Sequence, residues 1–152
     1  MAPAVLQHLG LRQANVLGHH TGAMVATEVG VQFPKLTRSL VVNGPMPMGD
    51  DERVKWLESN KKGEVDFVYQ PDGSHLAAAF MSRWKLYGGA DGSITGFKAD
   101  PKLITRYTVE RFQGFGPFWY GHHAAFTYDH EKGLRALKVR TLLLTNTTDM
   151  IY

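Results

Sequence analysis

Residues 14–23, ANVLGHHTGA, decide the fold of this chain. They begin with a short apolar run, residues 15–17, which has a β-branched centre and stops at Gly18. The segment GHHTG (residues 18–22) follows, and residues 23–29, AMVATEV, then contain no helix breaker. This pattern predicts a buried strand, a tight turn between two glycines, and a helix.

The two glycines of this turn make a sharp reversal possible. Because glycine has no Cβ atom, Gly18 and Gly22 are expected to avoid collisions between the adjoining strand and helix. His20 lies midway between them. We therefore expect His20 at a strained corner, with its side chain pointing off the top of the sheet.

Three segments of the chain resemble the α/β-hydrolases. In that family G-x-S-x-G joins a strand to a helix as the nucleophile elbow. Residues 16–23, VLGHHTGA, are similar to its common form VLGHSTGA, with His20 where the serine nucleophile belongs. Residues 29–47, VGVQFPKLTRSLVVNGPMP, and residues 128–149, YDHEKGLRALKVRTLLLTNTTD, resemble two later segments, in the family's order.

The order of the predicted elements agrees with this resemblance. Strands are expected at residues 14–17, 37–42 and 139–144, and helices at 3–9, 21–33, 50–62, 75–87, 101–112 and 131–137. Alternating strands and helices favour a parallel sheet with right-handed crossovers. The resemblance implies an α/β class and a partial α/β-hydrolase fold, shortened at both ends: a short parallel sheet of three strands, flanked by helices, with a helical cap insertion.

The resemblance also divides the chain. Residues 1–49 are expected to form the hydrolase core with the elbow, residues 50–129 the cap, and residues 130–152 the core strand that carries the acid position. The family's catalytic histidine and the loop that supplies half of its oxyanion hole have no counterpart in these segments.

The resemblance implies hydrolysis of small carboxylic esters without a cofactor. His20 occupies the nucleophile position, and imidazole can form covalent intermediates. Asp149, at the end of the third predicted strand, fills the acid position; the alternative is a turn or capping aspartate. The backbone N–H of Thr21 is expected at a helix N-terminus, where it can stabilise an oxyanion.

Other histidines are candidates for supporting roles. His19 precedes the nucleophile position, and His122 or His123 lies in the predicted cap, which can face the elbow. A histidine-dependent metal site is a further alternative, but adjacent histidines on a helix point about 100° apart and seldom bind one ion. We therefore expect no metal. Loss of the serine also leaves open a catalytically impaired binding domain that keeps an apolar pocket.

Composition limits the partners. The 152 residues carry 17 basic and 14 acidic side chains, a formal net charge of +3, without a basic-aromatic stripe, so no nucleic-acid partner is expected. No apolar run reaches the ~20 residues that span a bilayer. The N-terminus does not resemble a signal peptide, and the lack of cysteine favours a cytoplasmic setting. We expect a small ester as substrate and self-association through an exposed sheet edge.

Overall fold

The computed structural model describes residues 2–64, 69–86, 100–114 and 119–145. The chain forms two compact units. One contains residues 1–59 and 120–152, and the other contains residues 60–119. Asp149 lies outside the described residues, which end at residue 145. The domain boundaries expected from the sequence stay a prediction.

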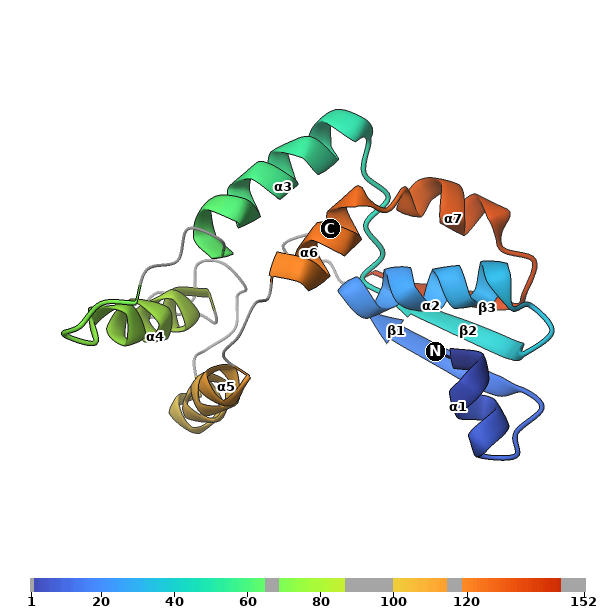
Figure 1. The fold of residues 1–152 in the computed structure, drawn as a ribbon, viewed down its shortest axis with the longest axis horizontal. Coiled ribbons are helices and arrows are strands. Elements are labelled where there is room, and N and C mark those ends of the chain that lie inside the picture. The colour runs from blue at the N-terminus through green and yellow to red at the C-terminus, as the bar shows by residue number, and fades with distance from the viewer. Residues whose placement is uncertain (1, 65–68, 87–99, 115–118, 146–152) are drawn as a thin grey trace. The chain divides into compact units, whose positions relative to one another are not determined.

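The first unit is built on a parallel sheet of three strands, as predicted (Figure 1). Its strands are β1 (Ala14–His19), β2 (Thr37–Asn43) and β3 (Thr141–Leu144), in the order β1-β2-β3. In the register of the sheet, Val16 pairs with Leu40, which pairs with Thr141. β1 is thus an edge strand of the described sheet.

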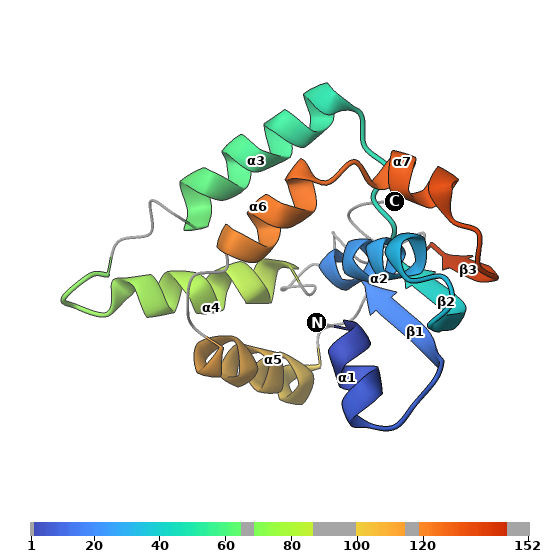
Figure 2. The same ribbon diagram turned by 45° about the vertical axis from the view of Figure 1, so that its right-hand side comes forward.

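Helices cover one face of this sheet. α2 (Thr21–Gln32) and α7 (His130–Ala136) lie along the same face in both views (Figures 1 and 2). Side chains alternate across a strand, so residues in register point to the same side. The resulting core contains fully buried and partly buried side chains: Ala23, Ala26, Leu40, Val42, Val16, Leu134, Leu137 and Val139.

The opposite face of the sheet is more exposed. Leu17 of β1 is 70% exposed, and Leu142 and Leu144 of β3 are exposed as well. The short helix α1 (Ala2–His8) lies on the side of β1 away from α2 and contributes no buried residue (Figures 1 and 2). Apolar strand residues thus remain in contact with solvent here.

A second core joins α2 to two further helices, α3 (Asp50–Glu64) and α6 (Trp119–Thr127). Met24 of α2 packs there with Met46 and Met48, which follow β2, and with Ala125 and Phe126 of α6. The Trp56 ring of α3 stacks on Phe126 with a centroid separation of 5.6 Å. α6 is the one described helix that the sequence pattern did not predict.

The unit of residues 60–119 contains α4 (Ser74–Leu86) and α5 (Pro101–Gln113), which pack together. α5 begins with a standard cap: the Asp100 carboxylate accepts a hydrogen bond of 2.9 Å from the Lys102 N–H, and Pro101 occupies the first turn. Ile104 and Thr108 of this helix are buried. Both helices match the predicted ranges within two residues.

Candidate functional site at the carboxyl ends of the strands

The corner between β1 and α2 has the strained geometry expected from the sequence. His20 has φ 50° and ψ −118°, and it is the only described residue other than glycine with a positive φ. An L-residue populates this region rarely, so the surrounding structure must hold it. The His20 N–H donates to the carbonyl oxygen of Asn43 at 3.0 Å, and the His20 carbonyl accepts from Ala23 N–H at 2.7 Å.

Of the two glycines in the turn, Gly18 is the one required by packing. A Cβ atom at Gly18 would lie 2.0 Å from the carbonyl oxygen of Gly22 and 2.6 Å from the Ala26 Cβ. A Cβ atom at Gly22 would meet nothing within 4 Å. The sequence interpretation is therefore right for Gly18, but its steric argument does not hold for Gly22.

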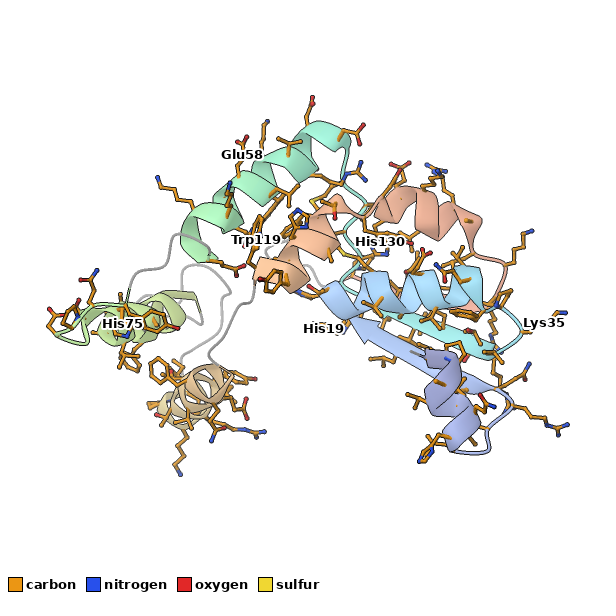
Figure 3. All side chains as sticks on the ribbon, in the orientation of Figure 1. His19, Lys35, Glu58, His75, Trp119 and His130 are labelled. Carbon is orange, nitrogen blue, oxygen red and sulfur yellow. The ribbon has the colours of Figure 1, made fainter. Side chains whose placement is uncertain are left out.

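The corner lies at the carboxyl edge of the sheet, where ligands bind in open α/β folds. His19, Asn43 and Leu144 are in register as the last residues of their strands. In Figure 3, His19 and Lys35 mark the two opposite ends of the sheet. Because the residues after parallel strands emerge at one edge, His20 lies on the same side as Thr145, the residue that follows β3.

The predicted site residues near His20 are partly brought together. The rings of His19 and His20 have centroids 4.2 Å apart at an interplanar angle of 41°. Thr21 is the first residue of α2, so its N–H belongs to the first turn, where N–H groups lack partners within the helix. This position is compatible with the predicted role of Thr21 as an oxyanion donor, which stays a prediction.

The two histidines of the predicted cap lie on α6. The ring of His122 is half-buried, with its centroid 5.9 Å from that of Phe126, whereas His123 is exposed. α6 packs on α2 through Met24, so it belongs to the same core as the first turn of the elbow helix. The supporting roles that the sequence suggests for His122 and His123 stay a prediction.

Sequence reasoning assigned no structural role to the most buried histidine. His130, the first residue of α7, is 1% exposed. Its Nδ1 accepts a hydrogen bond from the Met46 N–H at 3.2 Å, and its Nε2 lies 3.0 Å from Thr27 Oγ1. Burial lowers the pKa of His130 from 6.5 to about 4. This histidine therefore connects α7 to the elbow helix and to the segment after β2.

A second polar contact supports the same junction. The Tyr128 hydroxyl donates to a Glu28 carboxylate oxygen at 2.7 Å. Burial is the main cause that raises the pKa of Tyr128, and the hydrogen bond to Glu28 raises it further. A Cβ atom at Gly133 would lie 2.1 Å from the Tyr128 hydroxyl oxygen. The close packing of α7 against the Tyr128 side chain therefore depends on glycine at position 133.

No three histidine, aspartate or glutamate side chains within the described ranges come close enough to hold a metal ion. None of the described helices is long and apolar enough to span a membrane. What the described edge of the sheet offers chemically is a corner at which the half-buried His20 lies beside a helix N-terminus.

Solved structures share this fold. The chain aligns with a probable hydrolytic enzyme from Pseudomonas aeruginosa at a TM-score of 0.62 and 21% identity, over 97% of this chain and 47% of the other. A protein assigned to the non-heme bromoperoxidases of Mycobacterium tuberculosis gives a TM-score of 0.72 and 16% identity, over 99% and 54%. The thioesterase domain of the curacin biosynthetic pathway gives 0.55 and 15%, over 99% and 56%.

The chain has part of the α/β-hydrolase fold, as the resemblance implied. It spans about half the length of each of these three structures. At the level of sequence, no protein-family model and no curated protein matches the chain. The likeness therefore establishes the fold alone.

Proposed function

We propose that this chain hydrolyses small carboxylic esters by α/β-hydrolase-type chemistry, with His20 at the nucleophile position and Asp149 as the acid. One observation carries the proposal: His20 is held at φ 50° between a strand and a helix at the carboxyl edge of the sheet. Strained backbone of this kind is characteristic of active sites, and this corner corresponds to the nucleophile elbow.

The reaction proceeds in two steps. A ring nitrogen of His20 attacks the ester carbonyl carbon, and the oxyanion that forms is stabilised by the Thr21 N–H. The alcohol leaves as its alkoxide and takes up a proton, while the acylated ring of His20 loses its N–H proton. Water then attacks the acyl carbon, which releases the carboxylic acid and regenerates the imidazole. The Asp149 carboxylate stabilises the positive charge on the ring.

The first test is turnover of p-nitrophenyl acetate by His20→Ala, with His8→Ala of α1 as the matched control. We expect His20→Ala to reduce turnover to the background of the buffer, and His8→Ala to leave it unchanged. Circular dichroism establishes that both variants fold. Equal turnover by His20→Ala and the parent chain would contradict the proposal.

Three further variants test the roles of Asp149, His122 and His123. Asp149→Asn is expected to slow turnover without abolishing it, since the nucleophile remains. His122→Ala and His123→Ala show whether a histidine of α6 assists, in which case one of them lowers kcat while the other does not.

A second candidate is a binding domain without catalysis, which is favoured by the replacement of the family's serine by histidine at position 20. If the chain is such a binding domain, we expect short-chain esters to raise its melting temperature although no product forms. Release of p-nitrophenol above the His20→Ala background would exclude it.

A further inference from the structure

His130 occupies a junction between three parts of the first unit. It begins α7, and its ring is buried between α2 and the segment that follows β2 (Figure 3). That segment, residues 44–48, leads from the sheet to α3 and is buried at Met46 and Met48. The ring is thus a buried polar link in this junction, in addition to the hydrogen bond between Tyr128 and Glu28.

The hydrogen bonds fix the protonation of this ring. A backbone N–H can only donate, so Nδ1 of His130 must carry a lone pair toward Met46 at 3.2 Å. Nε2 then carries the single ring proton and donates to Thr27 Oγ1 at 3.0 Å. The Thr27 hydroxyl donates in turn to the Ala23 carbonyl at 2.8 Å. Each group in this series of hydrogen bonds is therefore assigned as a donor or an acceptor, and the His130 ring is neutral.

The charged groups around His130 come from α2, from α3 and from the residues at the start of α7. α2 contributes Glu28, which accepts from Tyr128 at 2.7 Å, and the Tyr128 ring centroid lies 5.9 Å from that of His130. Asp129, which caps α7, lies 3.7 Å from an Arg53 nitrogen of α3. Residues 44–48, GPMPM, contain no ionisable side chain.

The turn of α7 after this cap carries Glu131 and Lys132, both exposed. Glu131 pairs with Arg135, and the backbone N–H of Lys132 donates to Asp129. The hydrogen bonds of His130 with Thr27 and Met46 therefore go to neutral groups, so a positive charge on the ring gains no carboxylate from them.

We propose that His130 is an acid-sensitive latch: its neutral ring holds residues 44–48 against α2, and a proton on Nδ1 releases them. The added proton occupies the lone pair that accepts the Met46 N–H, so two donors then face each other and the bond is lost. The inference rests on the hydrogen bonds of the ring and is independent of the proposed esterase activity.

The sign of the pH dependence follows from burial. The pKa of His130 is about 4 in the folded chain, below its usual value of 6.5, so between these values the unfolded chain binds more protons than the folded one. The stabilising contribution of the neutral ring is complete above about pH 6.5, and it is lost as the pH falls from there toward 4.

Urea unfolding of the parent chain, His130→Gln and His8→Gln between about pH 6.5 and 4.5 tests the latch. For each unit that the pH falls, we expect the unfolding equilibrium constant of the parent to rise about five- to sevenfold more than that of His130→Gln, since one proton limits the factor to ten. His8→Gln, which removes an exposed histidine from α1, is expected to follow the parent. The same pH dependence in His130→Gln and the parent would overturn the proposal.

Nuclear magnetic resonance of the parent chain provides a test that does not need a folded variant. We expect the His130 ring proton on Nε2 at neutral pH and a titration midpoint of His130 below the usual histidine value of 6.5. As the pH falls, the Met46 amide is expected to lose protection from hydrogen exchange before the Val16 amide of β1. A proton on Nδ1, or simultaneous loss of protection at both amides, would overturn the latch.

Discussion

Gly18 and Gly22 approach each other so closely that a Cβ atom on Gly18 would lie 2.0 Å from the Gly22 carbonyl oxygen. This contact sets the angle at which α2 leaves β1, and it thereby places His20 at the corner. The backbone at Gly22 cannot retreat easily because the Ala23 N–H is bonded to the His20 carbonyl at 2.7 Å.

Gly18→Ala is expected to destabilise the chain by about 3 kcal/mol or more, because the added methyl group overlaps backbone atoms. Gly22→Ala is the matched control: its Cβ would meet nothing within 4 Å. Alanine in place of glycine inside a helix is favourable by about 0.5–1 kcal/mol, so this variant should be as stable as the parent or more so. Urea denaturation measures both. A Gly18→Ala protein as stable as Gly22→Ala would contradict the packing argument.

The buried hydroxyl of Thr27 gives a second prediction. Thr27→Val keeps the shape but leaves His130 Nε2 without its acceptor, and an unsatisfied buried donor costs about 1–3 kcal/mol. Thr27→Ser restores the hydroxyl and loses one methyl group, worth about 0.8 kcal/mol. We therefore expect Thr27→Ser to be more stable than Thr27→Val in thermal or chemical denaturation. The reverse order would show that the hydroxyl contributes less than the methyl group.

Tyr128 and Gly133 are expected to behave as a coupled pair. Tyr128→Phe removes a hydrogen bond to the Glu28 carboxylate and should cost about 1–2 kcal/mol. Tyr120→Phe, at a side chain that is 73% exposed, is the control and should change little. Gly133→Ala forces the Tyr128 hydroxyl away, so part of its cost should vanish when Tyr128→Phe is already present. Strict additivity in a double-mutant cycle would contradict this contact.

The edge of the sheet gives a prediction about association. β1, ANVLGH, carries no lysine, glutamate or proline, the residues that commonly protect edge strands. We expect two copies of the chain to associate through this edge, and Leu17→Lys to shift the population toward monomers. Val25→Lys, at a side chain on α2 that is 61% exposed, is the matched control. Light scattering coupled to size-exclusion chromatography measures the mass, and a parent chain that stays monomeric would contradict the expectation.

The sequence predicted the sheet and the elbow because the signals for them are local. Gly18 ends an apolar run, a breaker-free segment follows it, and the corner at His20 results from residues within a few positions of each other. The same reasoning failed for α6, because its sequence WYGHHAAFT combines glycine, histidine and aromatic residues, most of which are weak helix formers. Contacts such as the Trp56–Phe126 stack stabilise this helix, and no local pattern reports them.

The role of His130 was out of reach for a similar reason. Its two partners, Met46 and Thr27, are 84 and 103 positions away in the chain. A lone histidine at the start of a short helix has no spacing that distinguishes a buried link from a solvated side chain. His20, in contrast, is identified by the local motif GHHTG, and its chemistry is inferred from its position at the corner.

Mass spectrometry after rapid quenching of a reaction with p-nitrophenyl acetate tests the central claim most directly. We expect the peptide that contains residues 14–32 to gain the mass of one acetyl group, located on His20 by fragmentation and absent from His20→Ala. An acetyl group on another residue of the parent chain, or turnover without any acylated intermediate, would contradict the assignment of His20 as the nucleophile.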